Sequence, residues 1–313
     1  MTNPLATSFC GLELTSPVVL LSGCVGFGEE YTRVEGFSNR DAGAVVLKGT
    51  YLEPRLGNAP HRLCETPAGM LNAIGLQNPG ADAVINEILP GLDFTETRFF
   101  ANVCGSTIEE YAEVTRRFHD SPIDAMEINI SCPNVKKGGV EFGNRPETSG
   151  RVIAACRAAT TKPIIAKLSP NQTDIAANAR ACIDAGADAL SVINTVMGMA
   201  VDINKQQPVL GNRSGGLSGP AIRPIALLKV HQVYQEAGPR GIPIIGQGGI
   251  QTAHDAIEFF LAGATAVGIG TALFYDPLAA KKVNDGVRSY LAERGLGSIG
   301  DLVGSLQIPE RPD

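Results

Sequence analysis

The sequence contains no C-x-x-C pair and no cysteine and histidine spacing typical of a metal site. Its seven cysteines are scattered singly along 313 residues. An odd, dispersed set of this kind is typical of reduced thiols in a cytosol, where most cysteines serve as small buried hydrophobic residues. We therefore expect this chain to bind neither a structural zinc nor an iron–sulfur cluster.

An excess of positive charge and long apolar runs are also absent. The 26 Lys and Arg are outnumbered by 32 Asp and Glu, which gives a net charge of −6 and argues against nucleic acid or an anionic membrane as a partner. Residues 1–9 lack the basic and apolar regions of a signal peptide, and no apolar run approaches the roughly 18 residues of a membrane span. We expect a cytoplasmic protein.

The chain does contain a series of short apolar segments, most of which end at or just before Gly, Ser, Thr or Asn. They are continuous rather than alternating, as in parallel strands that are covered on both faces. The eight expected strands are residues 18–21, 44–47, 99–103, 125–131, 163–169, 189–195, 243–249 and 266–271.

Amphipathic segments of helical length separate most of these strands. The expected helices are residues 108–118, 150–159, 174–185, 220–237 and 253–261. Eight strand–helix repeats predict a single (β/α)8 TIM barrel domain over residues 1–313, with a hairpin at residues 9–15 that closes the bottom. A doubly wound sheet is disfavoured because the glycines at residues 23–28 do not have the G-x-G-x-x-G spacing.

Three connections are longer than a barrel needs. Residues 50–90, 133–145 and 196–218 all follow expected strands, on the face where barrel enzymes build their active sites. Long loops inside a compact domain are usually functional or disordered. We interpret these three as a roof over a substrate site.

The expected strand ends supply a set of polar side chains that includes two lysines and three asparagines. Such residues are uncommon in strands, which suggests a polar site, although any single one could merely terminate its strand as a turn residue. The set is Ser22, Lys48, Asn102, Asn129, Cys132, Lys167, Ser169, Asn194 and Thr195.

The last two expected strands end in glycine-rich loops, at residues 246–249 and 268–271. Glycine lets a ligand approach the backbone closely, and the loops after strands seven and eight are the usual phosphate site of this barrel. A flavin or a sugar phosphate would satisfy such a site. Tight turns without a ligand are the alternative.

Cys132 stands apart from the other cysteines because it lies at a strand end, between Ser131 and Pro133 and close to Lys136 and Lys137. An unperturbed thiol has a pKa near ~8.5, so a modest shift would make it a proton acceptor at neutral pH. The four histidines lie away from the strand ends. Cys132 is therefore the candidate base.

Taken together, these motifs resemble a known family, the class 1 dihydroorotate dehydrogenases. The resemblance is greatest to the catalytic subunit of the NAD-linked class 1B type. The resemblance runs nearly from end to end. It rests on KGT at 48–50, ETPAGMLNAIGLQNPG at 65–80, NISCPNVK at 129–136, KLSPN at 167–171, GGLSGPA at 215–221 and the two glycine loops.

The resemblance implies a barrel that holds FMN at its C-terminal mouth and oxidises (S)-dihydroorotate to orotate in pyrimidine (UMP) biosynthesis. Cys132 matches the catalytic base, and Lys48 and Asn129 are the other two residues expected to be catalytic. The positions that match FMN contacts are Ser22, Lys48, Gly49, Asn102, Asn129, Lys167, Ile193, Gly219, Gly248, Gly249, Gly270 and Thr271. Those that match substrate contacts are Lys48, Asn72, Ala73, Ile74, Gly75, Leu76, Asn129, Asn194 and Thr195. Cys24 stands where members of the family often have Thr, and it is given no role.

The resemblance also implies how electrons leave. In the class 1B type they pass to NAD through a separate subunit that carries FAD and a 2Fe-2S cluster, in a heterotetramer built on a homodimer of the catalytic chain. The alternatives are a class 1A enzyme linked to fumarate, a flavin barrel like that of dihydropyrimidine dehydrogenase, and a barrel that binds a phosphorylated ligand without turnover.

Overall fold

Eight parallel strands close into a barrel in the computed structural model, which describes residues 3–131 and 142–309. Neighbours around the barrel follow the order β3, β4, β7, β8, β9, β10, β15 and β16, and β16 pairs with β3 to close it. The strands are β3 (Val18–Leu20), β4 (Ala44–Val46), β7 (Arg98–Val103), β8 (Ala125–Asn129), β9 (Ile164–Leu168), β10 (Ala189–Val192), β15 (Ile244–Gln247) and β16 (Ala266–Ile269). The predicted (β/α)8 barrel is confirmed.

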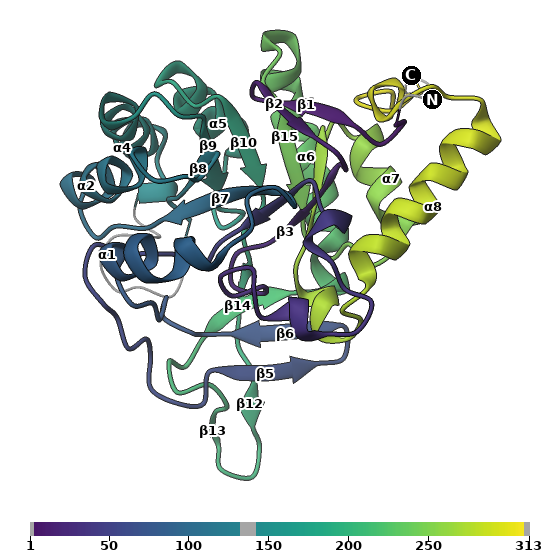
Figure 1. Ribbon diagram of the computed structural model, residues 1–313. Helices are drawn as coiled ribbons and strands as arrows, with labels where there is room; N and C mark the ends of the chain where they lie inside the picture. The colour runs from purple at the N-terminus through teal and green to yellow at the C-terminus, as the bar shows by residue number, and fades with distance from the viewer. Residues whose placement is uncertain (1–2, 132–141, 310–313) are drawn as a thin grey trace.

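Helices surround the barrel (Figure 1). They are α1 (Ala81–Ala83), α2 (Ile108–His119), α4 (Pro146–Ala159), α5 (Ile175–Asp184), α6 (Arg223–Ala237), α7 (Ala253–Leu261) and α8 (Ala279–Arg294). Shorter helical turns are η1 (Tyr31–Arg33), η2 (Asn39–Asp41), η3 (Val84–Ile88), η4 (Leu89–Gly91), η5 (Pro220–Ile222), η6 (Gly238–Arg240), η7 (Thr271–Phe274) and η8 (Ile299–Asp301).

Helix starts follow local capping chemistry. The side chain of Thr107 accepts a hydrogen bond from the backbone N–H of Glu110 at the start of α2, and Thr252 and Asp255 form a capping box at the start of α7. All five helices expected from the sequence are present, as α2, α4, α5, α6 and α7. The sequence patterns did not predict α8, whose buried Val283, Val287 and Leu291 recur every four residues and could have indicated it.

The hairpin of β1 (Thr7–Phe9) and β2 (Leu12–Leu14) closes one end of the barrel, as predicted. Phe9 and Leu14 are buried and pack against inward side chains of the barrel strands, among them Phe100 and Ile165. A second apolar layer lies between the strands and the helices. The interior of the barrel is therefore filled at this end, which leaves the opposite end for a site.

Two of the three long connections are not loops throughout. They contribute to a sheet with the order β11-β14-β6-β5, which lies at the end of the molecule opposite the β1–β2 hairpin (Figure 1). Its strands are β5 (Leu63–Thr66), β6 (Gly69–Asn72), β11 (Val196–Gly198) and β14 (Gly215–Ser218), and a small hairpin of β12 (Val201–Asp202) and β13 (Gln207–Pro208) extends from it.

The strands inside these connections were not predicted from the sequence. The pairing that joins the two connections, between β6 and β14, links residues 144 apart in the sequence, Asn72 and Gly216, which local patterns do not reveal. The sheet still covers the barrel mouth, as a roof would. Within the described ranges, no helix is both long and apolar enough to cross a membrane.

Candidate active site

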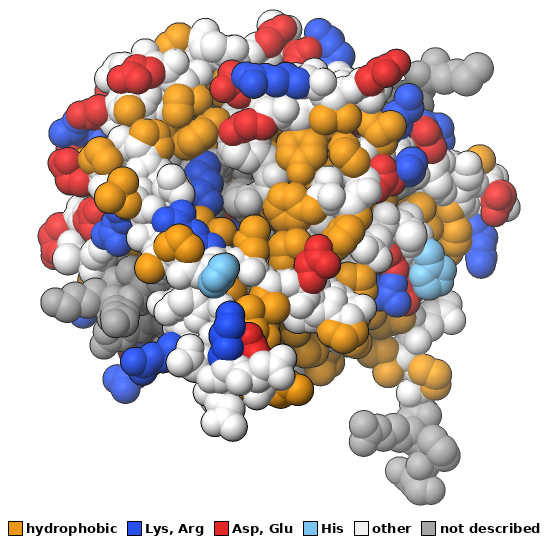
Figure 2. Space-filling model, turned by 90° about the horizontal axis from the view of Figure 1, so that it is seen from below, with side chains coloured by type: hydrophobic (Ala, Val, Ile, Leu, Met, Phe, Trp, Pro, Cys, Tyr) orange, Lys and Arg blue, Asp and Glu red, His pale blue; other side chains and the backbone are white. Residues whose placement is uncertain are grey.

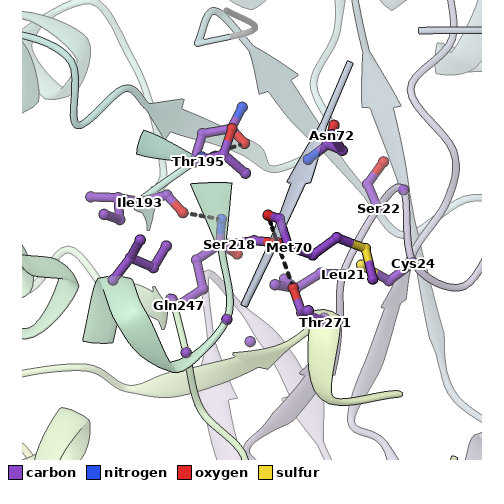
Figure 3. Close-up of a pocket in the computed structure, with 18 of the residues that line it drawn as sticks. Leu21, Ser22, Cys24, Met70, Asn72, Ile193, Thr195, Ser218, Gln247 and Thr271 are labelled. Atoms are coloured by element: carbon purple, nitrogen blue, oxygen red, sulfur yellow. Dashed lines mark hydrogen bonds between the residues drawn. The ribbon is translucent and has the colours of Figure 1, made fainter. Parts of the chain in front are cut away.

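A pocket opens at the C-terminal ends of the barrel strands, beneath the roof sheet. The face that carries β5 and β6 is hollowed near its centre, and basic and hydrophobic side chains border the hollow (Figure 2). In the close-up of Figure 3, Ile193 and Gln247 lie on one side of the pocket and Ser22 and Cys24 on the other. Segments far apart in the sequence thus supply its walls.

Most residues that the resemblance indicated lie on this pocket. Of the FMN set, Ser22, Lys48, Gly49, Asn129, Lys167, Ile193, Gly219, Gly248, Gly249, Gly270 and Thr271 line it. Of the substrate set, Lys48, Asn72, Ile74, Gly75, Leu76, Asn129, Asn194 and Thr195 line it. Two residues of these sets, Asn102 and Ala73, do not line it and are buried behind the wall. Ser169, from the strand-end set, is also buried and does not line the pocket.

A buried ion pair lies in the barrel interior beneath the pocket. Lys167 Nζ lies 3.2 Å from Glu127 Oε1, and both side chains are almost completely buried. Asn102 donates its Nδ2 to the same Glu127 oxygen at 2.6 Å. Asn102 is therefore a supporting residue of the site, and its side chain does not form part of the pocket surface.

A hydrogen-bond chain continues from this pair to the pocket wall. Asn129 Nδ2 donates to Asn102 Oδ1 at 3.2 Å, and Ser131 Oγ donates to Asn129 Oδ1 at 3.2 Å. Asn194 Nδ2 then donates to Ser131 Oγ at 2.9 Å, while Asn194 Oδ1 accepts from the backbone N–H of Thr195. The chain fixes two pocket amides, those of Asn129 and Asn194, in defined orientations.

The glycine loops supply backbone positions that other residues could not occupy. Gly248 and Gly249 have φ of +135° and +80°. A Cβ on Gly249 would lie 2.7 Å from the Gly219 carbonyl oxygen, and one on Gly248 would lie 2.6 Å from Ala226 Cβ. The loop therefore presents bare backbone to the pocket, which suits a phosphate group.

An unsatisfied polar atom also indicates a ligand. Gln247 Nε2 donates to the Ile193 carbonyl at 2.9 Å, and among the described residues Gln247 Oε1 has no partner although it is buried. Buried polar atoms are nearly always paired, so this acceptor fits a bound group with a hydrogen-bond donor. A flavin carries such donors, and together with the glycine loop the residues present fit FMN.

Cys24 lines the pocket, and burial raises the pKa of its thiol to about 11, although Lys167 and Lys48 act in the opposite direction. The thiol therefore stays protonated at neutral pH, which makes Cys24 a poor base. Cys132, the candidate base, lies outside the described residues with the rest of 132–141, including Lys136 and Lys137.

Several pocket residues escaped the sequence analysis. Leu21, Met70, Ser218, Gln247 and Phe274 line the pocket, and Glu127 lies beneath it. Met70 lies on β6 and Ser218 on β14, two strands of the roof sheet that were not predicted. Glu127 could have been found, because a glutamate in the middle of a continuously apolar strand already signals a buried charge.

One cluster elsewhere could hold a metal by distance alone. His254, Asp255 and Glu258 on α7 bring their ligand atoms within 4.8 Å of one another. Arg223 contacts both carboxylates, at 3.5 Å from Glu258, and offsets one of their two negative charges. The cluster is therefore an ion-pair network on the barrel exterior.

A closed barrel with a ligand pocket at its C-terminal mouth defines the class: the chain is a (β/α)8-barrel enzyme. The model of the family described as dihydroorotate dehydrogenase matches residues 4–291. The chain belongs to the dihydroorotate dehydrogenase family, and it is an oxidoreductase.

Relatives match over nearly their whole length. A protein of Trichlorobacter lovleyi is 52% identical over 297 residues, which covers 95% of this chain and 96% of the relative. One of Pelobacter propionicus is 50% identical over 308 residues, which covers 98% and 100%. Both are named dihydroorotate dehydrogenase B (NAD(+)), catalytic subunit. A crystal structure of DHODH from Eimeria tenella in complex with ferulenol has a TM-score of 0.80 at 22% identity, covering 97% of this chain and 89% of that one, and supports the fold.

Proposed function

We propose that this chain is the catalytic subunit of an NAD-linked dihydroorotate dehydrogenase, which oxidises (S)-dihydroorotate to orotate in pyrimidine biosynthesis. The observation that carries the proposal is one pocket that gathers Lys48, Asn72, Asn129 and Asn194 from four separate segments of the chain, beside a glycine loop suited to a phosphate. We also propose that residues 1–313 act as a single FMN-binding domain in the cytoplasm.

The residues divide into two groups around the pocket. Gly248, Gly249 and Thr271 would hold the FMN phosphate, with Lys167 near the flavin ring. When bound, FMN supplies the acceptor for the hydride that leaves C6 of dihydroorotate. Ser22, Gly49, Ile193, Gly219 and Gly270 would complete the cofactor site, and Asn102 would support it from behind the wall.

The substrate side uses charge and amide geometry. Lys48 would pair with the carboxylate of dihydroorotate, because a cation in a partly buried pocket attracts an anion strongly. Amides both donate and accept, so Asn72, Asn129 and Asn194 match the alternating N–H and C=O edge of a pyrimidine. Cys132, as a thiolate, would take the C5 proton, and the loss of this proton and of the C6 hydride would leave the C5–C6 double bond.

We infer further that electrons pass from FMN to NAD through a separate subunit carrying FAD and a 2Fe-2S cluster, docked on a homodimer of this chain. Two observations support this inference. The relatives carry "NAD(+)" and "catalytic subunit" in their names. Among the described residues, the one group of three or more possible metal ligands is His254, Asp255 and Glu258, and it contains no cysteine.

The decisive experiment is anaerobic reduction of the bound flavin. The purified chain is expected to be yellow, to release FMN on denaturation, and to lose its flavin absorbance when (S)-dihydroorotate is added. Dihydrouracil, which lacks the carboxylate for Lys48, is the matched control and should leave the flavin oxidised. A colourless protein, or equal bleaching by both compounds, would contradict the proposal.

A further inference from the structure

Glu127 occupies a position that the proposed function leaves without a role. It lies on β8 two residues after Ala125, which faces the barrel interior, while Met126 and Ile128 face the helices. Because side chains alternate along a strand, Glu127 points into the barrel, where it is completely buried. A carboxylate is placed there only at a cost, unless partners compensate it.

The first partner is a charge. Lys167 on β9 and Glu127 are 3.2 Å apart, with side chains 6% and 0% exposed. Lys167 also lines the pocket, as do the glycines of the loop that fits FMN. The single negative charge of Glu127 therefore offsets the single positive charge of Lys167 close to the proposed flavin.

The second partner is Asn102, the first residue of a chain of hydrogen bonds in which each donor and acceptor is fixed. A carboxylate only accepts, so Asn102 must turn its NH2 toward Glu127 and its Oδ1 toward Asn129. Asn129 must then donate to Asn102 and accept from Ser131. The donor and acceptor in each hydrogen bond are thus determined by the preceding hydrogen bond. The first of them is determined by Glu127, which can only accept.

We propose that Glu127 is a positioning residue for this reaction, which sets the amide orientation of Asn129 and Asn194 in the pocket and holds and partly neutralises Lys167. The proposal rests on the proposed function, since it takes the pocket to be an FMN and orotate site. It assigns no contact between Glu127 and either ligand. Glu127 acts through Asn102 and Lys167.

The charge effect is tested with Glu127→Gln, which keeps the size of the side chain and removes its charge. Without Glu127, the positive charge of Lys167 should favour the reduced flavin, which is the more negative form. At a fixed solution potential the ratio of reduced to oxidised FMN should rise about tenfold, which is an increase of about 30 mV in the reduction potential of a two-electron couple. Equilibration with a redox dye measures this without dihydroorotate. An unchanged potential would overturn the charge assignment.

The orientation effect is tested separately with Asn102→Leu, which interrupts the chain and leaves the Glu127–Lys167 pair intact. Orotate should bind about tenfold more weakly because Asn129 loses its orienting acceptor. The affinity is measured from the change that orotate causes in the oxidised flavin spectrum. Unchanged orotate affinity would overturn the orientation assignment.

A matched control is Glu113→Gln on α2, which removes one carboxylate that pairs with Arg117 on the outer surface. It should change neither quantity. If dihydroorotate does not reduce the flavin of the wild-type protein, the proposed function is refuted. The redox-dye measurement needs no dihydroorotate, so it tests the role of Glu127 independently of that outcome.

Loss of folding would also be informative, because an unpaired buried lysine is strongly destabilising. If Glu127→Gln does not fold, the double variant Glu127→Gln with Lys167→Gln should fold, since it removes both charges together. Recovery in the double variant supports the pairing. If the double variant also fails to fold, the assigned role of the pair is wrong.

Discussion

At the residue scale, Cys132 carries the largest expected effect on turnover. Cys132→Ala should retain FMN and lower the rate of flavin reduction by dihydroorotate by about 10²–10⁴-fold, since it removes the group that would take the C5 proton. Stopped-flow bleaching of the flavin measures this rate. Near-normal bleaching in the variant would reassign the base.

Cys24 is a pocket thiol whose burial makes it a poor base. Because its pKa is raised to about 11, its thiolate is scarce at pH 8, and alkylation of Cys24 should be about 10²-fold slower there than for an unperturbed thiol. The rate should keep rising with pH until about 11. Peptide mass spectrometry after timed iodoacetamide treatment reads it out, and a plateau below pH 9 would contradict the assigned environment.

Gly249 is the backbone position on which the cofactor proposal depends most. Gly249→Ala should weaken FMN binding by at least about tenfold, because the new Cβ strains a φ of +80° and meets the Gly219 carbonyl. Fluorescence titration of the flavin-free protein measures the affinity. Gly241→Ala is the matched control: its φ is +67° but nothing lies within 4 Å, so FMN affinity should not change.

At the scale of elements, the β1–β2 hairpin supports the barrel from the end opposite the pocket. Phe9→Ala should lower the free energy of unfolding by about 3–5 kcal/mol, since the ring is completely buried against the inward layer of the barrel. Chemical denaturation measures the loss. Leu56→Ala is the control, because that side chain is 88% exposed and its removal should change stability by no more than about 0.5 kcal/mol.

At the scale of the whole molecule, the electron acceptor distinguishes the two class 1 types. Co-expression with a subunit that carries FAD and a 2Fe-2S cluster should give a stable complex that reduces NAD with dihydroorotate. The isolated chain should bleach its flavin but not reduce NAD. Rapid reduction of fumarate by the isolated chain would instead indicate the class 1A type.

Much of this protein follows from its sequence alone. Eight apolar segments predicted the parallel barrel because strands covered on both faces need continuous apolar residues. Lys48, Asn129 and Lys167 were indicated as site residues because polar side chains at strand ends must meet at one mouth of a barrel. These are local signals, which the order of the residues already contains.

The tertiary structure decided the rest. Two connections expected to be loops contribute strands to the roof sheet, in which β6 pairs with β14. Asn102, expected at the pocket, lies instead in a buried hydrogen-bond chain. The tertiary structure also paired Glu127 with Lys167, residues 40 apart in the sequence. The reason is physical: hydrogen bonds and ion pairs between distant segments exist only after the barrel has closed, so no local pattern can specify them.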